Sequence, residues 1–150
     1  MEPAITVREL ARTERDAAVE LALRVFQRFE APDFSDRGVT TFRQSLHDEG
    51  YLSALCLYGA FWQGELAGIL ATRSEGTHIA LFFVEERYQR RGIGRALLDA
   101  ARAARPETRL TVHAAPFAVP IYHHLGFHDT APERTEHGLR FTPMALEAEA

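Results

Sequence analysis

An apolar segment that leads into a glycine-containing loop is the feature that most constrains the fold of this chain. The segment HIALFFV, from His78 to Val84, predicts a strand that is buried on both faces. The loop QRRGIG, from Gln89 to Gly94, follows it, and residues 95–104 carry apolar side chains at helical spacing until Pro106 ends the helix. A buried strand, a loop and a helix in this order are typical of α/β domains.

The remaining segments extend this pattern along the 150 residues of the chain. Asp16 is the expected N-cap of the first helix, and Pro32 interrupts that helix. The turn Gln63-Gly64-Glu65 predicts that two strands form a hairpin. We therefore expect one α/β domain over residues 1–150. The expected strands are 5–10, 53–62, 66–72, 78–84, 109–114, 127–130 and 139–146, and the expected helices are 17–29, 35–47, 95–104 and 118–125.

The loop and the start of the following helix are suited to binding a diphosphate. Gly92 and Gly94 allow the backbone to turn tightly and to approach a ligand closely. The free N–H groups of a helix N-terminus favour an anion, and Arg90, Arg91 and Arg95 add positive charge. The dinucleotide-binding fingerprint needs a third glycine, which the loop does not have. The P-loop of nucleoside triphosphatases needs a lysine, and this chain contains no lysine. Both of these alternatives are therefore poor matches.

The loop resembles the pyrophosphate loop of the GNAT superfamily of acyl-CoA N-acyltransferases. The segment from Leu81 to Leu98 is similar to the central motif of this family, with Gln89-x-x-Gly92-x-Gly94 as its core. A second signature, YHHLGF from Tyr122 to Phe127, resembles the family's Tyr-x-x-Leu-Gly-Phe element. The resemblance implies a GNAT fold, an α/β structure whose mixed central sheet of about six to seven strands is flanked by about four helices.

The same resemblance implies the activity and the cofactor. It implies an N-acetyltransferase that passes an acetyl group from acetyl-CoA to an amine by direct attack in a ternary complex, with no metal. Tyr122 matches the family tyrosine that protonates the CoA thiolate, although packing beside Phe127 would also explain an aromatic residue there. In the family, the pantetheine arm binds along the strand and the diphosphate binds the loop. The implied cofactor-binding residues are Phe82, Phe83, Val84, Gln89, Arg90, Arg91, Gly92, Ile93, Gly94, Arg95, His113 and Tyr122.

A general base is expected, because an alkyl amine has a pKa of about 10 and is almost entirely protonated at neutral pH. His78 lies 14 residues before Gly92, where some relatives carry a catalytic glutamate on the same strand. A neutral imidazole can accept a proton directly or through water, so His78 is the candidate base. A histidine that only caps the strand fits the pattern equally well. Glu75, in the preceding turn, is the alternative base.

The acceptor site is expected between the first two helices and the segment around Tyr122. A carboxylate there could attract a cationic amine, although acids at helix ends are often only solvated caps. His113 stands where the family often carries an asparagine that contacts the cofactor arm, so it belongs either to the cofactor site or to the acceptor site. The candidate acceptor-binding residues are Phe26, Phe29, Glu30 and Phe34.

Charge and composition argue against several other classes of protein. The net charge of −4 disfavours a nucleic-acid-binding domain, and no Cys-x-x-Cys or His-Glu-x-x-His motif supports a metal site. No apolar run is long enough to span a membrane, and no secretory signal is visible, so we expect a cytoplasmic protein. A homodimer is compatible with the resemblance. Two other interpretations stay open: a non-catalytic module that binds acyl-CoA, and an enzyme that acetylates a protein N-terminus.

Overall fold

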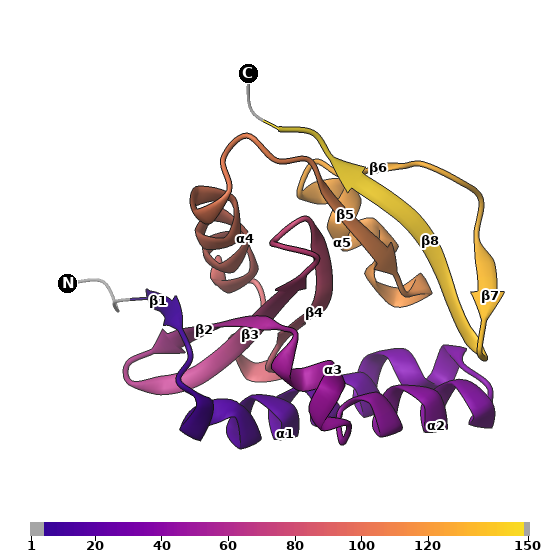
Figure 1. Ribbon diagram of the computed structural model, residues 1–150, viewed down its shortest axis with the longest axis horizontal. Helices are drawn as coiled ribbons and strands as arrows, with labels where there is room; N and C mark the ends of the chain where they lie inside the picture. Colours follow the sequence, from indigo (N-terminus) through magenta and orange to yellow (C-terminus); the bar gives the residue numbers. More distant parts are fainter. Residues whose placement is uncertain (1–4, 149–150) are drawn as a thin grey trace.

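The computed structural model describes residues 5–148, whose strands form a mixed sheet (Figure 1). The strand order is β1-β2-β3-β4-β5-β8-β6, and β7 pairs with β8 beside this path. The pairings of the described sheet are antiparallel, except that β4 and β5 are parallel. The strands are β1 (Ile5–Glu9), β2 (Cys56–Trp62), β3 (Glu65–Arg73), β4 (His78–Val84), β5 (Leu110–Ala114), β6 (His128–Asp129), β7 (Arg134–Glu136) and β8 (Leu139–Leu146).

The helices cover the two faces of the sheet in two groups, which Figure 1 shows in the lower and upper halves of the view. On one face, α1 and α2 pack with Leu81 and Phe83 of β4. On the other face, α4 and α5 pack with Ile79. A π-helical turn, η2 (Phe26–Glu30), extends α1, and a 3-10 turn, η5 (Pro116–Ala118), precedes α5. The helices are α1 (Arg15–Val25), α2 (Asp36–Ser45), α3 (Glu49–Ser53), α4 (Ile93–Ala104) and α5 (Val119–His124).

This architecture confirms the predicted α/β class, while three local details differ from the prediction. The sheet has eight strands, because residues 134–136 add a short strand whose exposed polar side chains carry no apolar signal. Residues 49–53 form α3 rather than lying between a helix and a strand, and the strand expected from residue 53 begins at residue 56. The side chain of Asp48 caps α3 by accepting a hydrogen bond from Tyr51 N at 3.1 Å. Asp16 is the second residue of α1 rather than its N-cap.

A β-bulge in β4 changes which side chains face which helices. Ala71 of β3 pairs with Leu81, and the next residue, Thr72, pairs with Ile79, so Ala80 has no partner on β3 in the described sheet. Because the extra residue shifts the alternation by one, Ile79 faces α4 and α5 whereas Leu81 faces α1. The bulge therefore divides β4 into two segments with opposite side-chain orientation.

β4 and β5 separate directly after this bulge. Their parallel pairing consists of His78 with Thr111 and Ile79 with Val112. Alternate side chains of β4 are only half-buried, including those in the second half of the strand. The prediction of a strand buried on both faces is therefore wrong for the second half of β4, because apolar residues there border the separation between β4 and β5.

The turn between β7 and β8 packs closely against α2. A Cβ at Gly38 would overlap the backbone of Gly138, and Thr41 Oγ1 donates a hydrogen bond to the His137 carbonyl at 2.9 Å. Gly38→Ala is expected to lower the free energy of unfolding by about 1–3 kcal/mol, although alanine is the better helix former. Chemical denaturation measures this. The control Thr40→Ala, at an exposed position of α2, should be neutral or slightly stabilising, and equal effects of the two changes would contradict the prediction.

Candidate active site

The loop after β4 leads into α4 through a left-handed turn. Gly92 is the N-cap of α4 with a φ of +81°, and Arg90 has a φ of +66°. The first backbone hydrogen bond of the helix runs from Ala96 N to Gly92 O at 3.0 Å. No backbone hydrogen bond of the described chain uses the N–H groups of residues 90–95. These groups are available to an anion at the positive end of the helix dipole.

Space around the loop is open enough for a diphosphate. A Cβ at Gly92 would meet no heavy atom within 4 Å, and a Cβ at Gly94 would meet only the ring of Phe82, at 3.6 Å. Arg91 is exposed and its guanidinium lies over the ring of Trp62, 5.0 Å from the centroid. Free N–H donors, nearby positive charge and open space therefore fit a diphosphate at this loop.

The edge of β4 that faces away from β3 offers backbone groups to a ligand. Glu85 N donates a hydrogen bond to Ala67 O of β3 at 2.8 Å. Because backbone groups alternate in direction along a strand, the N–H groups of Phe82 and Val84 point to the opposite side. The side chain of Gln89 donates a hydrogen bond to the Val84 carbonyl at 3.0 Å. Gln89 thus connects the loop to the end of the strand, and the Val84 carbonyl is already used.

A cavity of about 340 Å³ borders the separation between β4 and β5. Residues of η2, α2, β4, β5, α5 and β8 line it, and many of their side chains are aromatic. The ring of Phe26 stacks on that of Phe42 with 3.9 Å between centroids, and Phe42 meets Phe83 edge to face at 5.9 Å. Stacking of this kind holds the rings in fixed positions, so the cavity has a defined apolar wall.

Tyr122 borders the cavity on the side of α5. It is only 6% exposed, and its ring meets those of Phe82 and Phe127 edge to face, at 5.9 and 5.1 Å between centroids. Among the described residues its hydroxyl has no hydrogen-bond partner, and it is not sealed from the cavity. Burial, with a smaller contribution from the charge of Glu30, raises the pKa of Tyr122 above the usual range of a phenol. At neutral pH Tyr122 can therefore donate a proton but cannot act as a base.

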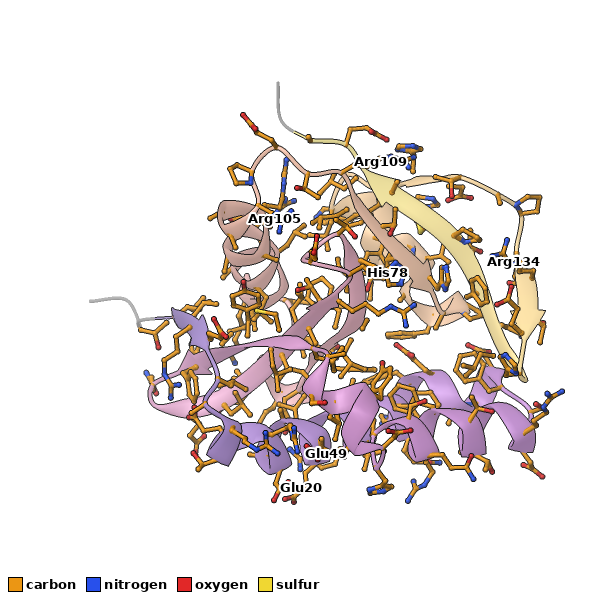
Figure 2. All side chains as sticks on the ribbon, viewed as in Figure 1. Glu20, Glu49, His78, Arg105, Arg109 and Arg134 are labelled. Atoms are coloured by element: carbon orange, nitrogen blue, oxygen red, sulfur yellow. The ribbon has the colours of Figure 1, made fainter. Side chains whose placement is uncertain are left out.

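His78 lines another part of the cavity, near the centre of the molecule (Figure 2). Its Nδ1 shares a hydrogen bond with Thr111 Oγ1 at 2.8 Å, and its ring meets that of His113 edge to face at 4.9 Å. Burial, followed by the positive charge of Arg73, lowers the pKa of His78 to about 4. His78 is thus neutral at neutral pH and is a weak base. Glu75 is exposed in the preceding turn and does not line the cavity.

The other candidate acceptor residues do not all meet in the cavity. Phe26, Glu30 and Phe34 line it, whereas the ring of Phe29 stacks on Phe117 at 4.9 Å outside it. The π-helical turn explains the difference, because it changes the direction in which successive side chains leave the end of α1.

His113 lies beside His78 and stacks on Phe141 with 4.2 Å between centroids. It is on the face of the sheet opposite α4, since its neighbours Val112 and Ala114 join the core beneath α4 and α5. This position fits the acceptor side of the cavity better than the cofactor side, where the loop and α4 begin.

Two charged side chains of the cavity, those of Glu30 and Arg73, determine much of its electrostatic potential. Burial, followed by the negative charge of Asp33, raises the pKa of Glu30 to about 7. Arg73 also lines the cavity and pairs in register with His78 across β3 and β4. The hairpin pattern could have revealed Arg73, because antiparallel strands joined by short turns determine which residues lie opposite each other.

A family model described as an acetyltransferase (GNAT) domain matches residues 30–148. The chain belongs to the GNAT acetyltransferase family. No curated protein matches the sequence. Within the described residues of this GNAT chain, no group of three or more His, Cys, Asp or Glu could hold a metal ion, and no helix is long and apolar enough to cross a membrane.

Solved GNAT structures share the fold of the whole chain. A GCN5-related N-acetyltransferase from Rhodopseudomonas palustris has 21% identity and a TM-score of 0.81, covering 98% of both chains. The PaiA N-acetyltransferase from Thermoplasma acidophilum, in complex with coenzyme A, has 18% identity and a TM-score of 0.66, covering 96% of this chain and 99% of its own. The ribosomal-protein-S18-alanine N-acetyltransferase from Escherichia coli has 24% identity and a TM-score of 0.63, covering 98% of this chain and 96% of its own.

Proposed function

We propose that this GNAT chain transfers an acetyl group from acetyl-CoA to an amine. The observation that carries the proposal is the arrangement of the loop, the open edge of β4 and the cavity, with Tyr122 in contact with Phe82 between them. The coenzyme A bound to the PaiA N-acetyltransferase supports the choice of cofactor. The aromatic cavity supports an acceptor that binds beside the cofactor arm.

In this proposal each part of the site has a separate task. Acetyl-CoA supplies an activated acetyl group and a thiol leaving group. The N–H groups of residues 90–95 bind the diphosphate, and the N–H groups of Phe82 and Val84 bind the amide arm. Tyr122 donates its proton to the sulfur as negative charge develops there. The burial that raises the pKa of Tyr122 disfavours a thiolate at the same place, so proton transfer between the two groups remains feasible.

The amine must lose a proton before its nitrogen can attack. His78 lines the cavity and remains a candidate for this step. However, its pKa of about 4 makes it a poor acceptor for the proton of an ammonium ion. Hydrogen bonding through a neutral imidazole suits His78 better, so a stronger base on the cavity wall is expected.

Calorimetric titration of the purified chain with acetyl-CoA tests the proposed function, with NADH and ATP as control ligands. We expect selective binding of acetyl-CoA in the micromolar range, about −8 kcal/mol. A free-thiol assay with a panel of amines then measures acetyl transfer. A folded protein that does not bind acetyl-CoA would contradict the proposal.

Two alternatives give different results in the same experiments. A non-catalytic acyl-CoA-binding module binds acetyl-CoA but releases no thiol with any amine. An enzyme that acetylates a protein N-terminus releases thiol with peptides and not with small amines. The cavity of about 340 Å³ favours a small amine, because its volume is typical of small-molecule sites.

A further inference from the structure

Two charged side chains of the cavity lack a partner within residues 5–148. Arg140 and Glu136 also line the cavity, but both are paired with neighbours outside it. No hydrogen bond or ion pair between described residues reaches the carboxylate of Glu30 or the guanidinium of Arg73. The unpaired carboxylate of Glu30 is unfavourable in its buried position until a ligand of opposite charge meets it, whereas Arg73 lines the cavity from an exposed position and is free to bind an anion. Glu30 and Arg73 are therefore candidate contacts for an acceptor that carries both charges.

Glu30 lies at the end of the cavity near Tyr122. It is the last residue of η2, and the stacking of Phe29 on Phe117 holds η2 against η5, directly before α5. Glu30 and Tyr122 both line the cavity, and the negative charge of Glu30 adds to the effect of burial in raising the pKa of Tyr122. Glu30 therefore lies on the same side of the cavity as the proposed proton donor.

Arg73 lies at the end of the cavity near His78. The two residues are paired across β3 and β4, so their side chains leave the same face of the sheet about 5 Å apart at Cβ. The positive charge of Arg73 lowers the pKa values of His78 and His113, and it also acts on Tyr51. His78, His113 and Tyr51 line the cavity together with Arg73, whereas the charge that adds to burial in raising the pKa of Tyr122 is that of Glu30.

The wall of the cavity between Glu30 and Arg73 is apolar. The ring of Phe26 stacks on Phe42 and meets Phe34 at 5.6 Å between centroids. Phe82 and Phe83 complete the wall on the side of β4. An acceptor that reaches both charged ends must therefore place an apolar body along these rings.

We propose that the acceptor is a small amine whose ammonium group and carboxylate stand at opposite ends of an apolar or aromatic body, as in an ω-amino acid. Arg73 binds the carboxylate, the phenylalanine rings hold the body, and Glu30 holds the ammonium group and accepts its proton. This inference rests on the proposed acetyltransferase function and adds the class of acceptor to it.

Glu30 accepts one proton from the ammonium group, which leaves a lone pair on the nitrogen. That pair forms the bond to the acetyl carbon while the carbon–sulfur bond breaks, and the sulfur keeps the electron pair and takes the proton of Tyr122. Tyr122 regains a proton from the nitrogen of the new amide, and Glu30 releases its proton to water. The net products are an amide, a thiol and one proton.

The pH dependence of the reaction tests the role of Glu30. Asp33, in the next turn, and Tyr122, on α5, are ionisable groups that interact with Glu30. Further ionisable groups face the same cavity from β8, β4 and β5: Arg140, His78 and His113. Because Glu30 has a pKa of about 7 and acts as a carboxylate, kcat/KM should rise as the pH increases through about 7.

Variants assign this inflection to one residue. Glu30→Gln should lower kcat by about 100-fold and remove the inflection, and Glu30→Asp should restore part of the rate. Asp33→Asn should move the inflection to lower pH, because it removes a negative charge that raises the pKa of Glu30. His78→Ala should leave the inflection in place. An inflection that disappears in His78→Ala and persists in Glu30→Gln would overturn the role given to Glu30.

Matched acceptors test the role of Arg73. The ω-amino acid 4-(aminomethyl)benzoate is compared with benzylamine, and 6-aminohexanoate with pentylamine, in the free-thiol assay. In at least one of the two pairs, we expect kcat/KM to be at least about tenfold higher for the amino acid than for its matched amine. A charge-assisted hydrogen bond usually has an effect of this size. Arg73→Gln should reduce the ratio of kcat/KM between the two members of a pair to about one, and Arg73→Lys should keep part of the preference. Arg43→Gln, at an exposed position of α2 outside the cavity, is the matched control and should behave like the wild type.

The outcomes separate this inference from the proposed function. A folded chain that does not bind acetyl-CoA contradicts the acetyltransferase function itself. Binding of acetyl-CoA with equal or better use of the carboxylate-free amines overturns the acceptor class alone. Binding of acetyl-CoA without acetylation of either amino acid overturns it as well.

Discussion

Tyr122→Phe is expected to lower kcat by about 100-fold, the usual size of one general acid–base contribution. The change removes only the hydroxyl and keeps the ring that packs against Phe82 and Phe127. The affinity for acetyl-CoA should therefore stay within about twofold, because the loop and the edge of β4 are unchanged. Single-turnover thiol release and calorimetric titration measure the two quantities separately.

Stability and a matched variant complete this test. The Tyr122 hydroxyl has no partner among the described residues, so its removal should change the free energy of unfolding by no more than about 0.5 kcal/mol. Tyr58→Phe makes the same chemical change in a half-buried tyrosine on β2 that does not line the cavity, and kcat should be unaffected. A wild-type kcat in Tyr122→Phe would mean that Tyr122 only packs.

Gly92→Leu is expected to abolish acetyl-CoA binding, with a loss of affinity above about 100-fold. Gly92 has a φ of +81°, and a side chain there would extend into open space next to the free N–H groups of the loop. The side chain would occupy the position that we assign to the diphosphate. Calorimetric titration with acetyl-CoA measures the affinity.

Gly64→Leu provides a control with the same backbone strain. Gly64 has a φ of +85° in the turn between β2 and β3, and a Cβ there also meets nothing within 4 Å. Both variants should lose about 1–2 kcal/mol of stability, because a side chain disfavours the left-handed conformation. Only Gly92→Leu should lose acetyl-CoA binding. Equal affinities of the two variants would remove the loop from the binding site.

The strand, loop and helix of the family motif were predictable because their signals are local. β4 and β8 have the predicted bounds, and α4 buries its stripe of Ile93, Leu97 and Leu98. Helical and strand periodicity require only neighbours in the chain, and glycine determines its own backbone freedom. Residues 134–136 were missed for the same reason, since their strand exists only through its pairing with β8.

The tertiary structure decided the chemistry of the cavity. The bulge at Ala80 depends on the register between β3 and β4, which sets the face that each side chain of β4 occupies. The pKa of Glu30 depends on burial among residues that are distant in the sequence. The sequence by itself therefore determined the family, the loop and the identity of the candidate tyrosine. Only the folded chain decided which charges face the cavity, because burial and electrostatic potential are properties of the three-dimensional arrangement and not of local sequence.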